Sequence, residues 1–340
     1  MKRRRYIQSL LSLIACCFLL AALSSCVKRD LCDCCTPEEQ LVDYNLTLVF
    51  NHMKDTITTT YSTKANSDFI DMHAIIDIYS DDGFPFSTDN QRMERKLHTI
   101  PSVKKGKNTA TISLKLPAQK LKFLSWIHCG EDNKHFDVED LCAVKIKSAD
   151  EPINDSKYAY CGVLPVDISG NEGLTINDTM LLETPFAEYQ VIANDLQKFK
   201  ADYNLITTSD LRTKAVYSMW LPYGYNVMTQ DVNYFESDVS FHYNLSEASP
   251  ESVILISDHV FISKNSKKKD IEPDTEINIS FVIYDKNKNI INGADNLAIP
   301  LKQAHLTLLT GAFLTKEFAP GSIGIDDGFE GDEIVIILPD

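Results

Sequence analysis

The fold class is decided by the stretch Tyr44-Asn45-Leu46-Thr47-Leu48-Val49-Phe50, in which large apolar residues stand at every second position. Successive side chains of a β-strand point to opposite faces, so a period of two predicts a strand with one buried face. The same alternation recurs at 111–116 and at 277–283. These patterns predict half-buried antiparallel strands.

Further strand patterns follow along the chain, with turn residues between them and almost no helical periodicity. Asn194 or Asp195 is placed to cap one short helix that ends near Phe199. The 14 tyrosines and 16 phenylalanines suit sheet cores better than helical bundles. The remaining predicted strands are 73–79, 121–129, 174–182, 186–193, 215–221, 239–245, 252–262, 305–318 and 333–338.

The strand pattern stops and restarts around Glu183-Thr184-Pro185. Two successive groups of short strands joined by turns are typical of two β-sandwiches in tandem. We therefore predict an all-β protein with an N-terminal β-sandwich at 41–184 and a C-terminal β-sandwich at 185–340.

The first 26 residues carry the pattern of an exported lipoprotein. A basic head, Lys2-Arg3-Arg4-Arg5, precedes an apolar run from Ile7 to Leu23, and Leu23-Ser24-Ser25-Cys26 ends the pattern. This order is typical of a secretory signal peptide, and its end resembles the bacterial lipobox, in which cleavage precedes a lipid-modified cysteine. The apolar run of about 17 residues is short against the ~20 of a membrane-spanning helix. We predict a signal peptide at 1–25 and lipidation at Cys26.

The residues after the cleavage site predict a tether and an outer-membrane location. Residues 26–40 have little apolar content and no periodicity, so we expect a lipidated tether there. Val27 is not the aspartate that retains some lipoproteins in the inner membrane, which favours the cell outer membrane. The anchor to the membrane would be the lipid on Cys26.

Nine cysteines are present, and six remain after the signal peptide and Cys26 are set aside. An even number in an exported protein permits disulfides but fixes no pairing. The cluster of Cys32, Cys34 and Cys35 lacks the repeated C-x₂-C pair or the spaced histidines of a zinc site. This favours free or disulfide-paired thiols over a metal site. We expect at least one of the later three to be a simple buried side chain. The six are Cys32, Cys34, Cys35, Cys129, Cys142 and Cys161.

The chain is acidic. Its formal charge of −15 falls to −19 when the four basic residues of the signal peptide are removed. A nucleic-acid-binding surface needs a basic stripe, and the longest basic run, Lys267-Lys268-Lys269, is followed at once by Asp270. We therefore predict no nucleic-acid partner. An acidic body on a lipid tether suits a domain held away from an anionic membrane.

Motifs of enzyme active sites are absent from the sequence. It contains no G-x-S-x-G, H-E-x-x-H, Walker loop or G-x-G-x-x-G. The S-x-x-K match at 102–105 falls in what reads as a basic turn after Pro101, and the eight histidines lack ligand spacing. We predict no enzyme activity, no cofactor and no metal site.

Two acidic stretches are candidate calcium loops. The stretch 285–289 begins like an EF-hand, but Ile290 stands where the loop needs Gly and Asn296 where it needs Glu. A hairpin turn explains it better. Residues 326–333 hold five carboxylates in eight positions, and a polar loop before the last strand is favoured there over calcium.

Several segments together carry a family resemblance. They are 189–199, 255–261, 282–285, 299–307, 311–315 and 321–329, preceded by Asp30-Leu31-Cys32 and 124–130. In that order they resemble the fimbrial-subunit-like lipoproteins of Bacteroidales, the group that includes minor-fimbria anchor subunits. The resemblance covers most of 26–340.

The resemblance implies two transthyretin-like β-sandwich domains and a surface-exposed lipoprotein. Anchor and accessory members of that family join pili by strand exchange, in which main-chain hydrogen bonds give affinity and side-chain pockets give specificity. A role in fimbria-like assembly or adhesion follows, with a fimbrial or other surface protein as partner. No arginine-cleavable leader strand is found, which suits an anchor or tip-associated subunit better than a shaft subunit.

An alternative function is a stand-alone surface lipoprotein that binds a glycan or a protein. It rests on Trp220, Tyr223 and Tyr225, since exposed aromatic rings stack on sugar faces. Core packing explains Trp220 equally well.

The C-terminal run 333–338 is apolar without alternation, which predicts a strand buried on both faces. It either fills a central position in its own domain, which is favoured, or is donated to a neighbour.

Overall fold

The computed structural model describes residues 41–52, 70–81, 92–103, 106–129, 135–147, 158–203, 207–218, 220–264, 275–316 and 333–337. Within these ranges the helical elements are the short helix α2 (Leu196–Asp202) and the 3₁₀ turn η3 (Thr208–Asp210), and the other elements are strands. The predicted all-β class is confirmed. Among the same residues, no helix combines the length and the apolar character needed to cross a bilayer.

The first sandwich packs a three-stranded sheet against a four-stranded sheet. The alternating residues of the stretch 44–50 form its centre, and the Tyr44 ring stacks on Phe123 of the opposite sheet with centroids 5.1 Å apart. The strand predicted from this stretch is confirmed. The three-stranded sheet has the order β4 (Gly106–Pro117), β1 (Leu41–His52), β9 (Thr175–Leu182). The four-stranded sheet has the order β3 (Arg92–Val103), β2 (Ile70–Ser80), β5 (Lys120–Cys129), β8 (Ala159–Asp167).

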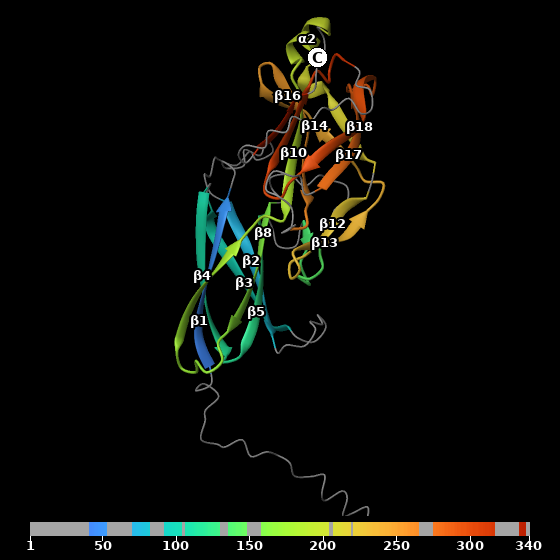
Figure 1. The fold of residues 1–340 in the computed structure, drawn as a ribbon. Helices are drawn as coiled ribbons and strands as arrows, with labels where there is room; N and C mark the ends of the chain where they lie inside the picture. The colour runs from blue at the N-terminus through green and yellow to red at the C-terminus, as the bar shows by residue number, and fades with distance from the viewer. Residues whose placement is uncertain are drawn as a thin grey trace, which may run out of the picture.

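The second sandwich packs a five-stranded sheet against another four-stranded sheet. Its core includes Phe241, Phe281 and Phe313, and the last two rings meet edge to face at 5.4 Å. The two predicted tandem sandwiches are therefore present, and Figure 1 shows them end to end. The five-stranded sheet has the order β15 (Ser246–Ser249), β16 (Ser252–Phe261), β10 (Phe186–Ala193), β19 (Leu306–Gly311), β20 (Glu333–Ile337). The four-stranded sheet has the order β14 (Ser240–Asn244), β11 (Arg212–Tyr217), β17 (Thr275–Tyr284), β18 (Ile290–Leu301).

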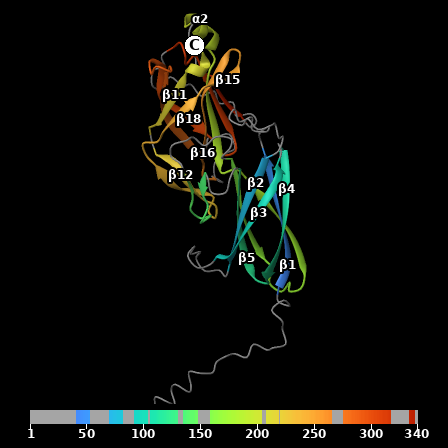
Figure 2. The same cartoon turned by 180° about the vertical axis from the view of Figure 1, so that it is seen from behind.

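A further small sheet joins the two halves of the chain. Its order is β13 (Asp231–Glu236), β12 (Leu221–Asn226), β7 (Val144–Ile146), β6 (Phe136–Asp137). In both views β12 lies at the end of the second sandwich that faces the first (Figures 1 and 2). Gly224 of β12 pairs with Lys145, and a Cβ at Gly224 would lie 2.7 Å from that of Tyr234, so the close strand approach needs glycine.

One apolar cluster includes residues from both sides of the boundary predicted between 184 and 185. Trp126 of β5 is fully buried, and its ring centroid lies 5.3 Å from that of Phe136 and 6.4 Å from that of Phe261. On the surface, Lys264 Nζ donates to Glu183 Oε2 at 2.7 Å. The 184/185 boundary itself stays a prediction.

The structure corrects three details of the predicted elements. The strand expected at 215–221 is two strands, because the chain leaves one sheet after Tyr217 and enters another at Leu221. Ser102 and Val103 belong to β3 and not to a turn. Asp195 is the N-cap residue of α2, but its side chain makes no cap hydrogen bond. It accepts instead from the backbone N–H groups of Leu314 and Thr315, so it holds a distant turn.

The C-terminal strand β20 pairs with β19 of its own chain. The pairing is parallel and runs from Leu306↔Glu333 to Thr310↔Ile337. The predicted pairing of this strand within its own chain is confirmed. The prediction that it occupies a central position in the sheet is wrong. The strand lies at the edge of its sheet because β10 already occupies the other side of β19.

Candidate binding surface

The outer face of the sheet β14-β11-β17-β18 is the candidate binding surface. Strand alternation sends Ala215, Ile279 and Phe281 into the core. The residues between them, including Val216 and Val282, point outward and remain exposed. One sheet thus supplies both a core wall and an open, partly apolar surface.

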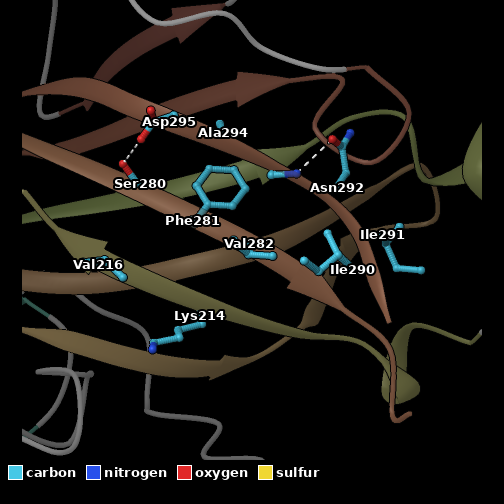
Figure 3. A pocket seen from close by; sticks show the side chains of 11 residues that line it. Lys214, Val216, Ser280, Phe281, Val282, Ile290, Ile291, Asn292, Ala294 and Asp295 are labelled. Atoms are coloured by element: carbon cyan, nitrogen blue, oxygen red, sulfur yellow. Dashed lines mark hydrogen bonds between the residues drawn. The ribbon is translucent and has the colours of Figure 1, made fainter. Parts of the chain in front are cut away.

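A hollow of about 670 Å³ lies on this face, lined by residues of β11, β17 and β18 (Figure 3). Its apolar part is formed by Val216, Val282 and Ile290, the last with 73% of its surface exposed. Ser280 donates to Asp295 and fixes the polar side of the hollow. The strands approach closely here, since a Cβ at Gly293 would lie 2.5 Å from the Phe281 carbonyl oxygen.

The strand β18 borders this hollow and forms the edge of its sheet. Among the described strands it pairs with β17 alone. Its 12 residues carry one formal charge, Asp295. The equally long edge strand β3 carries four, at Arg92, Glu94, Arg95 and Lys96. Charged side chains protect sheet edges from pairing with other chains, so β18 is much the less protected edge.

A second, smaller hollow of about 240 Å³ lies at the end of β11 and β17. Trp220 and Phe235 form its wall and are 65% and 47% exposed. Tyr217, Leu221 and Ile277 form its buried floor. Its rim is polar and consists of Thr275, Glu276 and Asn278.

The aromatic trio predicted from the sequence is only partly exposed. Trp220 is exposed, but Tyr223 and Tyr225 are buried, and the expectation for these two was wrong. The reason is that β12 lies between β13 and β7, and the Tyr225 ring stacks on Phe261 at 5.5 Å. Phe235, which takes their place beside Trp220, was missed by the sequence analysis, because its strand shows no pattern that separates it from a loop.

Beneath the surface, three tyrosine hydroxyls surround the buried carboxylate of Asp258. Tyr217 donates to its Oδ2 at 2.6 Å and Tyr243 at 3.1 Å, and the Tyr189 hydroxyl bonds that of Tyr217. Burial, and next the nearby Asp258 charge, raise the pKa of all three tyrosines well above the ordinary value. The cluster is a satisfied polar network of the core.

The described cysteines lie in the core. Cys129, Cys142 and Cys161 are all buried and form no disulfide, which confirms the prediction of at least one simple buried cysteine. Burial raises the pKa of the Cys142 and Cys161 thiols to about 12, so both are protonated at neutral pH. Within the described part of the chain, no group of three His, Cys, Asp or Glu side chains is arranged to hold a metal ion.

The two candidate calcium stretches have different outcomes. Asp285 forms the predicted hairpin turn, because its Oδ1 accepts from the backbone N–H groups of Asn287 and Asn289, each at 2.8 Å. The hydrogen bonds from Asn289 lower the pKa of its carboxyl below the ordinary value. The acidic loop before residue 333, the signal peptide, Cys26, the tether and Cys32, Cys34 and Cys35 lie outside the described residues.

A family model matches residues 37–338, and that family is described as a family of unknown function, DUF6562. The chain belongs to DUF6562. No curated protein matches this DUF6562 chain.

Solved structures similar to this DUF6562 chain come from Bacteroidales. A fimbrial assembly protein from Parabacteroides distasonis has 12% identity and a TM-score of 0.38, and the match covers 82% of this chain and 94% of that one. The fimbrial anchor protein Mfa2 from Porphyromonas gingivalis has 10% identity and a TM-score of 0.36, with 74% and 82% covered. A candidate polysaccharide-binding protein (DUF1812) from Bacteroides thetaiotaomicron has 10% identity and a TM-score of 0.42, with 75% and 80% covered. Two of these structures are fimbrial proteins, which agrees with the family resemblance of the sequence. With TM-scores this low, the matches assign no function to the chain.

Proposed function

We propose that this chain is a surface-exposed outer-membrane lipoprotein that acts in fimbria-like assembly or adhesion, without enzyme activity. The anchor would be the lipid on Cys26, at the end of the basic, apolar and small-residue pattern of the first 26 residues. Contact with a fimbrial or other surface protein would be made through a sheet edge.

The observation that carries the contact is the edge strand β18. It offers a long row of backbone donors and acceptors, a single charge, and a neighbouring hollow of about 670 Å³ that could take side chains of an added strand. Pro300 lacks an N–H group, so pairing would be restricted near that end of the strand.

The lipid anchor is tested by metabolic labelling with palmitate. The Cys26→Ala variant should take up no label and should accumulate as a precursor outside the outer-membrane fraction. The Cys32→Ala variant is the matched control and should label normally. Normal labelling of Cys26→Ala would contradict the anchor.

The edge contact is tested by placing a photo-crosslinking amino acid at Ala298 of β18 in living cells. Ala110 of β4 is the matched control, because it is also a half-buried alanine on an edge strand. We expect an adduct at position 298 that mass spectrometry maps to an extended segment of another surface protein, and none at 110. No adduct at 298, or equal adducts at both positions, would contradict the proposal.

A further inference from the structure

The small hollow beside Trp220 combines two aromatic walls with a polar rim. Trp220 comes just before β12, and Phe235 of β13 is the pairing partner of Pro222 in the same hollow. Large aromatic side chains with 65% and 47% exposure are costly to leave in water and commonly mark a binding site.

The rim supplies the hydrogen-bonding groups that the walls lack. Thr275, Glu276 and Asn278, near the start of β17, are among the lining residues and carry a hydroxyl, a carboxylate and an amide. A carboxylate accepts hydrogen bonds from sugar hydroxyls, and an amide can both accept from them and donate to them. A sugar ring presents this pair of surfaces, with C–H groups on its faces and hydroxyls at its edge.

The volume of the hollow and the charges around it limit the chemical class of the ligand. A hollow of about 240 Å³ is smaller than the ~300–1,000 Å³ of pockets for drug-sized molecules, so it suits one ring. No cationic side chain is among its lining residues in the described chain, Glu276 is anionic, and the whole chain carries −15. These charges disfavour acidic sugars. An apolar protein side chain is also disfavoured, because it would remove water from the Glu276 carboxylate without replacing its hydrogen bonds.

We propose that this hollow binds a neutral pyranose unit of a glycan. The ring faces pack on Trp220 and Phe235, and the hydroxyls bond to Glu276 and Asn278. The inference goes beyond the proposed fimbrial role and does not depend on β18 or on the lipid.

The two tryptophans of the chain make the test direct. Trp126 is fully buried and Trp220 is exposed, so acrylamide quenching of the intrinsic fluorescence reports mainly on Trp220. The probes are neutral oligosaccharides of mannose, glucose, galactose and xylose, with polygalacturonate as the acidic comparison. At least one neutral probe should protect Trp220 from quenching in a saturable way, and polygalacturonate should not.

Variants then assign the site by isothermal titration calorimetry with the protecting probe. Removing a central aromatic contact typically weakens binding tenfold or more, so Trp220→Ala and Phe235→Ala should each bind at least about tenfold more weakly than the wild type. Glu276→Gln should also weaken binding while it leaves the melting temperature unchanged. Leu97→Ala, at a residue 70% exposed in the first sandwich, is the control and should bind as the wild type does.

Three results would overturn the proposal. In the first, none of the neutral probes protects Trp220 from quenching. In the second, Trp220→Ala binds the probe as tightly as the wild type does. In the third, protection increases with protein concentration in the absence of any probe, which would assign the hollow to self-association.

Discussion

Each sandwich has one four-stranded sheet, and the two sheets differ in what covers the face that points away from the sandwich core. In the first sandwich, the outer face of β3-β2-β5-β8 lies under the β6–β7 segment and residues of the second half, with Trp126 against Phe136 and Phe261. In the second sandwich, no described element covers the outer face of β14-β11-β17-β18, which carries the hollow of Figure 3. The covered face joins the two halves of the chain, and the other face is the one to which we assign binding.

The sequences of the strands reflect this difference. β5 is buried at nearly every position from Leu121 to Cys129, as expected of a strand covered on both faces. β17 alternates, with Ile277, Ile279 and Phe281 buried and the positions between them more exposed. A continuous apolar strand thus predicts a second covering layer, and an alternating strand predicts an open face.

The largest expected effect comes from Trp126→Ala, which removes the centre of the covered face. Replacing a fully buried aromatic residue by alanine leaves a cavity and costs about 3–5 kcal/mol in the free energy of unfolding. Urea unfolding followed by circular dichroism measures it. Trp220→Ala, at the exposed wall of the smaller hollow, should change stability by no more than about 0.5 kcal/mol.

Trp126→Phe sharpens this test. It keeps an aromatic ring and removes an indole N–H that has no hydrogen-bond partner among the described residues, so it should cost clearly less than alanine. Equal losses at positions 126 and 220 would contradict the distinction between the two faces.

The next effect concerns the buried charge of the covered face. Both carboxylate oxygens of Asp77 accept from Arg95 at 2.6 Å, and Arg95 also donates to the Val138 carbonyl at 2.9 Å, which ties β2 and β3 to the segment before β7. Asp77→Asn should lower the free energy of unfolding by about 3 kcal/mol, because it breaks a buried ion pair. This is the low end of the usual range, since the Arg95 side chain is 24% exposed and water can solvate it. Chemical denaturation measures the loss.

The exposed Lys96–Glu94 pair on the same edge strand is the control, and Glu94→Gln should leave stability unchanged. A loss of under 1 kcal/mol in Asp77→Asn would mean that the pair does not hold the covering segment in solution.

The fold class and most long strands follow from local pattern, because alternation records which face is buried. The segment that covers the first sandwich was not predictable in the same way. β6 has two residues and β7 three, and the strand β12 that pairs with β7 is about 80 residues away along the chain. The same non-local pairing buries Tyr223 and Tyr225. Trp220 was visible as an aromatic candidate, but the hollow it forms depends on Phe235 and β17, which only the folded chain brings together.

A smaller effect on stability is expected from Tyr217→Phe in the core of the second sandwich. The substitution removes one donor from the buried Asp258 carboxylate and should cost about 1–3 kcal/mol at neutral pH. Because the folded-state pKa values of Tyr189, Tyr217 and Tyr243 lie well above the unfolded value near 10, their contribution is fully present below pH 10.

That contribution is lost as pH rises above 10, since the unfolded chain then releases protons that the folded chain retains. Each such tyrosine lowers the free energy of unfolding by about 1.4 kcal/mol per pH unit in this range. Urea unfolding between pH 8 and 11 should therefore show a steep alkaline decline that is shallower in Tyr217→Phe. A stability that stays flat above pH 10 would contradict the burial of this cluster.

The smallest expected effect on stability is that of Ile290→Ala on the open face. With 73% of its surface exposed, Ile290 has nearly the same surroundings in the folded and unfolded chain, so the free energy of unfolding should change by no more than about 0.5 kcal/mol. Ile283→Ala, a fully buried position on the adjacent strand β17, is the matched control and should cost about 2–5 kcal/mol. The functional expectation is the reverse, because Ile290 lines the hollow beside β18: Ile290→Ala should weaken the cross-link from position 298. If Ile290→Ala destabilised the protein as much as Ile283→Ala, the outer face of this sheet would be covered in solution and could not serve as a binding surface.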